Sequence, residues 1–273
     1  MKTSKLRVGI IGCGAIGSAI AKYCSKNLTR VITVSAIFDI DKERADVLKE
    51  ALSGETAIEK SLDGLARSCD LIVEAASCEA ARPALEAAAR HSKDILVMSA
   101  GGLIGNEEFL ESAGEDGRRV YVPSGAVAGL DGIKAARVGG IDEVVLTTKK
   151  PPEGLKGAPY IEENGIDLDA IKDDELIFEG SAKEAIKAFP KNVNVSATLS
   201  LAGIGAERTR VRIICSPGQS RNSHEIELKG KAGNFFVRTE NVPSPDNPRT
   251  SYLAVLSAIA VLEGIASGVR VGT

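Results

Sequence analysis

The sequence predicts an α/β protein: an N-terminal doubly wound parallel sheet, then a smaller α+β domain with a mainly antiparallel sheet. Three observations predict this architecture. A glycine-rich turn, Gly12-Cys-Gly-Ala-Ile-Gly17, directly follows an apolar, β-branched run. Short Val- and Ile-rich runs then alternate with helical patterns as far as residue 122. Beyond that point the pattern changes to strands with one polar face and a hairpin.

The first half alternates strands and helices. Apolar runs predict strands at 6–11, 31–38, 70–75, 94–99 and 119–122. Helical patterns predict helices at 15–26, 41–52, 59–68, 79–91 and 105–114. Because parallel strands need long crossover connections, helices between strands favour a parallel sheet covered on both faces. We therefore expect a Rossmann-type domain over residues 1–124.

The second half predicts a different kind of sheet. Strands are expected at 143–149 and 208–215, and a hairpin at 224–229 and 235–240. The helix at 181–189 begins with Ser181 as N-cap and Glu184 in position to complete a capping box. We expect an α+β domain over residues 125–244, which binds the substrate and forms the dimer. A C-terminal helix, within about 245–273, is expected to pack back on the first domain.

The glycine-rich turn indicates a dinucleotide site, because its G-x-G-x-x-G spacing lies between a strand and a helix. Gly12 permits the tight turn, Gly14 permits close approach of a pyrophosphate, and Gly17 permits close packing of helix on strand. The first N–H groups of the helix, at Ala15 and Ile16, and its dipole favour the phosphates. A glycine turn in another kind of α/β protein is the alternative interpretation.

Asp39 follows the second predicted strand, where an acidic side chain suits a hydrogen bond to a ribose hydroxyl. Its carboxylate would repel a 2′-phosphate, which favours NAD. Lys42 and Arg44 follow closely and would accept NADP if Asp39 rotated away. We expect NAD to be preferred, with some use of NADP.

Three loops are predicted at the carboxyl ends of strands, where open parallel sheets bind their ligands. They are 75–77, which contains Ala76 and Ser77; 99–103; and the glycine-rich segment 123–131, which contains Ala126. We expect these loops near the nicotinamide end of the cofactor. The same glycines would also suit an interdomain hinge.

Composition and charge argue against several classes of protein. The net charge is −3 and no basic tract occurs, which argues against a nucleic-acid partner. The apolar segment 253–262 is too short to span a bilayer, so no membrane partner is expected. The five cysteines show no metal-ligand spacing, which predicts a reduced, cytoplasmic protein without a bound metal.

Several motifs resemble the L-aspartate dehydrogenase family of the archaeal and bacterial type. They are Pro123-Ser-Gly-Ala-Val-Ala-Gly-Leu-Asp131 and the runs 73–77, 192–198, 222–225 and 246–251. The resemblance covers essentially the whole chain. It implies NAD(P)-dependent oxidative deamination of L-aspartate to iminoaspartate, which hydrolyses to oxaloacetate and ammonia. It also implies a role in supplying iminoaspartate for NAD biosynthesis. It also implies a homodimer, cofactor contacts at Ala126 and Asn192, and a catalytic histidine at His224.

The chain has two histidines, and they differ in setting. His91 ends a helix, where a solvated histidine is favoured by the dipole. His224 begins a strand, a place where a histidine is more often structural, but the resemblance makes it the candidate base. Hydride removal from an amino acid needs a neutral amine, and histidine suits the removal of the ammonium proton and the activation of water. Glu225 should face the other side of the strand.

The two carboxylates of aspartate require cationic or hydroxyl donors. The sequence offers several without choosing among them: Lys134, Lys149, Arg249, Thr250 and Ser251. Two alternatives stay open for the whole protein. One is another two-domain enzyme, similar to homoserine dehydrogenase or dihydrodipicolinate reductase, although substrate motifs of these enzymes are not seen. The other is a dinucleotide-binding sensor without turnover, which would need no base at His224.

Overall fold

The computed structural model describes residues 5–190, 194–219, 221–245, 247–267, 269 and 271–272. The chain forms two compact units. Unit 1 comprises residues 1–123 and 255–270, and unit 2 comprises residues 124–254 and 271–273.

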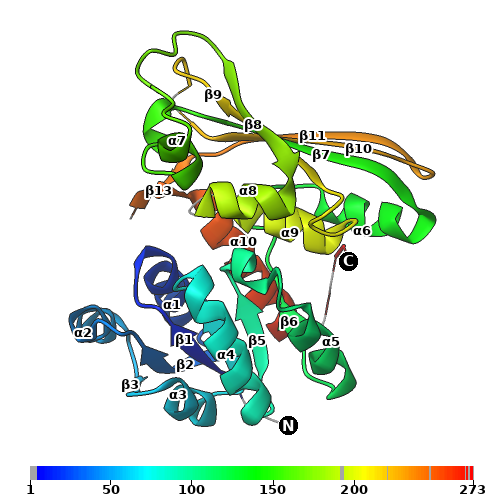
Figure 1. Ribbon diagram of the computed structural model, residues 1–273. Coiled ribbons are helices and arrows are strands. Elements are labelled where there is room, and N and C mark those ends of the chain that lie inside the picture. Colours follow the sequence, from blue (N-terminus) through cyan, green and yellow to red (C-terminus); the bar gives the residue numbers. More distant parts are fainter. Residues whose placement is uncertain are drawn as a thin grey trace. The chain divides into compact units, whose positions relative to one another are not determined.

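Unit 1 is built on a six-stranded sheet (Figure 1). In spatial order its strands are β3 (Ala57–Ile58), β2 (Ile32–Phe38), β1 (Leu6–Ile11), β4 (Leu71–Glu74), β5 (Asp94–Val97) and β6 (Val120–Tyr121). All neighbouring strands are parallel. The predicted doubly wound sheet is therefore confirmed, and β1 and β4 flank the point where the strand order reverses. Ligands bind at such switch points.

Helices connect the strands of unit 1. They are α1 (Ala15–Asn27), α2 (Lys42–Ala51), α3 (Leu62–Ser68), α4 (Cys78–Arg90), a 3₁₀ turn (Ala100–Leu103) and α5 (Glu107–Glu115). The C-terminal helix α10 (Tyr252–Ala266) belongs to unit 1 from Val255 onward. The hydroxyl of Tyr23 on α1 donates to Oε1 of Glu263 on α10 at 2.9 Å, which links these two helices.

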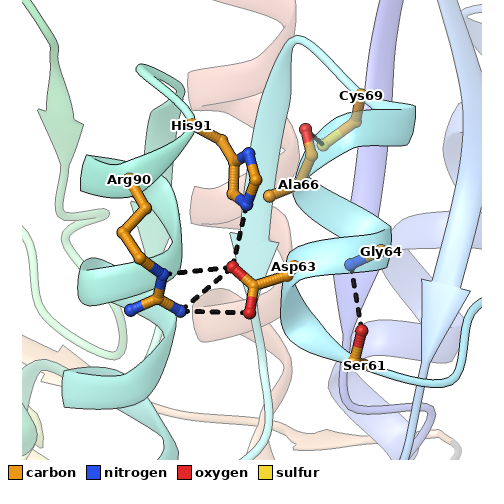
Figure 2. A network of polar contacts seen from close by, with 7 residues as sticks. All are labelled: Ser61, Asp63, Gly64, Ala66, Cys69, Arg90 and His91. Carbon is orange, nitrogen blue, oxygen red and sulfur yellow. Dashed lines mark hydrogen bonds and ion pairs between the residues drawn. The ribbon is translucent and has the colours of Figure 1, made fainter.

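A polar network joins α3 to α4 (Figure 2). Asp63, in the first turn of α3, accepts hydrogen bonds from the Arg90 guanidinium, and its Oδ1 lies 2.8 Å from Nε2 of His91. The hydrogen bonds from His91 and Arg90 lower the pKa of Asp63. The expectation that His91 is solvated holds only in part, since its side chain is 22% exposed and its ring contacts Asp63. The negative charge at one helix start and the basic groups at the other helix end complement both dipoles.

Unit 2 contains a five-stranded sheet. In spatial order its strands are β11 (Gly233–Glu240), β10 (Ser223–Gly230), β7 (Ile141–Lys150), β9 (Arg210–Cys215) and β8 (Glu175–Ser181). Strand β7 is parallel to β9, and the other neighbours are antiparallel. The mainly antiparallel sheet is confirmed, while the parallel pair and β8 were not predicted. A separate antiparallel pair is formed by β12 (Pro243–Ser244) and β13 (Asn247–Ser251).

The helices of unit 2 are α6 (Leu130–Gly139), α7 (Pro159–Glu163), α8 (Ala182–Ala188) and α9 (Asn194–Ala202), with a 3₁₀ turn at Pro152–Gly154. Helices α6, α8 and α9 lie along one face of the sheet (Figure 1). The predicted capping box of Ser181 and Glu184 starts α8. Within the core that these helices cover, β7 contributes Val144 and Leu146. The opposite face of the sheet carries ion pairs such as Lys229–Glu143 at 2.9 Å.

Candidate active site

The glycine turn of unit 1 lies between β1 and α1, at the switch point of the sheet. Gly12 has φ +91°, and a Cβ there would lie 2.7 Å from the carbonyl oxygen of Ala75. A Cβ on Gly17 would overlap the carbonyl oxygen of Gly12, whereas one on Gly14 would meet nothing within 4 Å. The open space at Gly14, beside the free first-turn N–H groups that a helix start offers, fits a bound pyrophosphate.

Asp39 follows β2 and is held in place by two backbone groups. Its Oδ2 accepts the N–H of Cys13 in the glycine turn at 2.6 Å, and its Oδ1 accepts the N–H of Asp41 at 2.8 Å. Arg44, one of the residues that could have received a 2′-phosphate, lies 3.1 Å from Asp41 in an ion pair. Rotation of Asp39 would therefore cost two hydrogen bonds.

Glu74 ends β4 and is fully buried, with 0% of its surface exposed. It accepts hydrogen bonds from the N–H of Ala76 at 2.8 Å and from the N–H and hydroxyl of Ser99 at 3.0 and 2.9 Å. Burial raises its pKa, against the lowering effect of these hydrogen bonds. The carboxyl thus ties together two of the three predicted loops, and Ala76 and Ser77 are exposed beside it. The sequence analysis did not single out Glu74. The signal that could have found it is an acidic residue at the end of an apolar strand.

His224 lies on β10 in unit 2 and is only 5% exposed. It is paired with Thr148 of β7, and the Thr148 Oγ1 lies 3.0 Å from its Nδ1. Burial, and then the nearby charge of Lys150, lower the pKa of His224 to about 3. The imidazole is therefore neutral at physiological pH, and in this state it is a weak proton acceptor. Glu225 forms an ion pair with Arg238 at 3.6 Å.

Ala126 is held close to the same hairpin. Its carbonyl oxygen accepts hydrogen bonds from the Asn241 amide at 2.9 Å and from the Thr239 hydroxyl at 3.3 Å. Thr239 in turn pairs with His224 across β10 and β11. Within unit 2, Thr239 thus links Ala126 to His224, and Asn241 binds the same carbonyl oxygen of Ala126. Sequence reasoning missed both Thr239 and Asn241. Asn192, the other cofactor contact implied by the resemblance, lies outside the described residues.

A cavity of about 620 Å³ opens within unit 2. Polar side chains in its lining include Lys150, Asn222, Asn241, Thr250 and Ser251. The described lining of this cavity does not include His224. Thr148 and Lys150 of β7, which both lie near His224 of β10, border a separate small void. The volume is within the range of small-molecule sites.

The candidate substrate-binding residues separate into two groups. Thr250 and Ser251 line the cavity. Lys149 pairs with Asp174 at 3.0 Å, and Lys134 pairs with Asp131 at 3.6 Å. Nothing is described of the Arg249 side chain. Lys150 was not among the candidates. Of the two adjacent lysines, Lys149 and Lys150, it is Lys150 that is buried and lines the cavity.

The described residues contain no group of three or more His, Cys, Asp or Glu side chains suited to a metal ion. None of their helices is both long and apolar enough to cross a membrane.

A doubly wound unit with this glycine turn, and a second unit with a buried neutral histidine, define a two-domain dehydrogenase that uses a pyridine nucleotide. Residues 131–265 match the family model "Aspartate dehydrogenase, C-terminal", and residues 12–123 match "Homoserine dehydrogenase, NAD binding domain". The chain belongs to the L-aspartate dehydrogenase family.

Relatives of similar length support this assignment. The chain is 45% identical to the L-aspartate dehydrogenases of Methanosarcina barkeri and Methanosarcina mazei, over 98% of its own length and 100% of theirs. It is 39% identical to that of Bradyrhizobium diazoefficiens, over 99% of this chain and 95% of the relative.

Solved structures share the fold. The aspartate dehydrogenase of Thermotoga maritima matches with a TM-score of 0.73 and 25% identity, covering 98% of this chain and 100% of that one. A homoserine dehydrogenase from Thiobacillus denitrificans matches with a TM-score of 0.62 at 15% identity, covering 96% of this chain and 73% of that one. This second likeness shows the fold alone.

Replacing Glu74 with Gln should loosen the two loops of unit 1. An amide cannot accept all three hydrogen bonds, so we expect the free energy of unfolding to fall by about 1–3 kcal/mol. Urea unfolding measures this loss, and NADH titration should show weaker binding. The same change at the exposed Glu111 is the control. Equal stability of both variants would show that Glu74 does not hold the loops.

Proposed function

We propose that this protein catalyses the NAD-linked oxidative deamination of L-aspartate to iminoaspartate, which water converts to oxaloacetate and ammonia. The observation that carries the proposal is the buried, neutral His224, held by Thr148 in a chain that matches L-aspartate dehydrogenases from end to end. A dinucleotide-binding sensor would have no need of such a base.

The histidine has a defined proton task. Substrate enters as an ammonium, and its nitrogen must lose a proton before its lone pair can form the C=N bond. If Nδ1 carries the imidazole hydrogen and donates it to Thr148 Oγ1, Nε2 keeps the lone pair that accepts this proton. A pyridine nucleotide held at the glycine turn of unit 1 would supply the acceptor for the hydride of the substrate Cα. Hydride loss from the neutral amine leaves an iminium cation. Once His224 has released its proton to solvent, it can take a proton from the water that adds to the iminium carbon.

NAD is proposed as the preferred cofactor, with some use of NADP. The support is the Asp39 carboxylate, which two backbone N–H groups hold in place, and the ion pair that occupies Arg44. A 2′-phosphate would have to approach a fixed negative charge. Lys42, which is exposed on α2, leaves NADP a weaker route.

The setting of the enzyme follows from the family resemblance. We propose a homodimer, whose iminoaspartate product feeds NAD biosynthesis. The exposed Phe236 on β11 supports association with another surface. A cytoplasmic location is supported by the buried free thiols of Cys13, Cys24, Cys69 and Cys215.

A substrate panel tests the proposed reaction directly. Reduction of NAD is followed by absorbance with L-aspartate, L-homoserine and other amino acids. We expect L-aspartate to give the highest kcat/KM because the family match extends through residues 131–265. Faster reduction with L-homoserine would overturn the assignment.

His224→Ala tests the proton acceptor. Loss of a general base should lower kcat by about 10²–10⁴-fold, while NADH affinity is retained. His91→Ala is the matched control, since His91 contacts Asp63 in unit 1 and should leave kcat unchanged. Stopped-flow and fluorescence titration measure the two quantities. Full activity of His224→Ala would exclude this residue as the base.

Asp39→Ser tests cofactor choice. Removing the carboxylate should lower the ratio of kcat/KM for NAD to that for NADP by about tenfold, or about 1.4 kcal/mol. Asp46→Ser, at an exposed position on α2, is the control. A wild-type enzyme with higher kcat/KM for NADP would contradict the proposed preference.

A further inference from the structure

Lys150 is a buried cation that the proposed reaction has not yet used. It ends β7, is only 8% exposed, and lines the cavity of unit 2. Two residues earlier on the same strand, and so on the same face, Thr148 contacts His224. The other cations in the described lining, Lys156 and Arg221, are exposed. Lys150 therefore differs from them in depth and in its position beside the histidine.

The cavity around Lys150 combines apolar and polar groups. Leu155 and Phe189 are buried in its wall, whereas Asn222 and Asn241 supply amides. Burial lowers the pKa of Lys150 to about 8, which leaves the side chain mostly protonated at neutral pH. A buried ammonium that lines a cavity attracts a carboxylate that enters the cavity.

We propose that Lys150 is the carboxylate-binding residue of the substrate site, whose ammonium receives one of the two carboxylates of L-aspartate in this cavity. The inference rests on the proposed function. It assigns the recognition of a dicarboxylate to a residue that no motif singled out.

The position of Lys150 has a second consequence, for His224. Burial is the larger cause of the lowered pKa of His224, and the positive charge of Lys150 lowers this pKa further. A carboxylate bound to Lys150 would offset that charge, so substrate binding would make His224 a stronger proton acceptor. The buried histidine would then be most basic only when the group to be deprotonated is present.

Kinetics of Lys150→Met test the assignment. Loss of a buried charge-assisted contact should raise KM for L-aspartate at least about thirtyfold. The Kd of NADH should stay within about twofold, since the cofactor turn lies in unit 1. Lys150→Arg should recover part of the affinity for L-aspartate. Lys149→Met makes the same change at the neighbouring lysine, which pairs with Asp174, and should leave KM nearly unchanged.

Binding of succinate gives a readout that needs no turnover. Calorimetry should detect succinate binding to the wild-type enzyme and to Lys149→Met, and little binding to Lys150→Met. Butyrate, with one carboxylate, should bind more weakly than succinate. A folded Lys150→Met variant with wild-type KM and wild-type succinate affinity would overturn the proposal.

Protection from acetylation tests the wild-type protein should the variants fail to fold. Succinate should slow the acetylation of Lys150 relative to Lys149, as measured by mass spectrometry, and equal rates with and without succinate would refute the proposal. The two hypotheses fail differently. Succinate binding at Lys150 without aspartate oxidation would reject the proposed function alone, and aspartate oxidation that is indifferent to Lys150→Met would reject this inference alone.

Discussion

The candidate site depends on the antiparallel register between β7 and β10. Thr148 is opposite His224, and the pairs Leu146–Ile226 and Val144–Leu228 continue along the same strands. These apolar residues belong to the core of unit 2. Because side chains alternate along a strand, a slip of one residue would turn both the core residues and His224 to the other face. The hydrophobic pairs therefore fix the position of the histidine.

A related constraint acts in unit 1. The strand β4 is buried throughout and ends in the carboxyl of Glu74, which binds the backbone of both neighbouring loops. In unit 2 the corresponding contact joins two side chains, since Thr148, near the end of β7, holds the ring of His224. Apolar packing supplies the stability, and these few hydrogen bonds determine the local geometry.

Local patterns predicted much of this architecture. The glycine turn and the capping box of Ser181 depend on residues close together in sequence, and each forms the predicted local structure. The parallel pairing of β7 with β9 joins distant segments, so no local pattern could indicate it. Asn241 follows the end of β11, and its contact with Ala126 also depends on the tertiary fold.

The two adjacent lysines show a subtler limit. Alternation predicts that Lys149 and Lys150 face opposite sides of β7, but it does not tell which one is buried. Val145 and Thr147, on one face, are buried, and so are Leu146 and Thr148 on the other. Over residues 144–148 both faces carry only apolar or neutral side chains, so this part of the strand lacks the polar–apolar contrast that would orient its last two residues.

The orientation matters because of what lies beside each lysine. Lys149 meets a carboxylate within the protein, Asp174, which already balances its charge. Lys150 lies near a neutral histidine, whose proton affinity its charge lowers. An enzyme for a dicarboxylate can use this arrangement, since a substrate carboxylate beside Lys150 would offset the charge that disfavours the protonated histidine. The electrostatic cost of placing a cation beside the proton acceptor is then removed by substrate binding itself, and the same interaction favours two carboxylates over one.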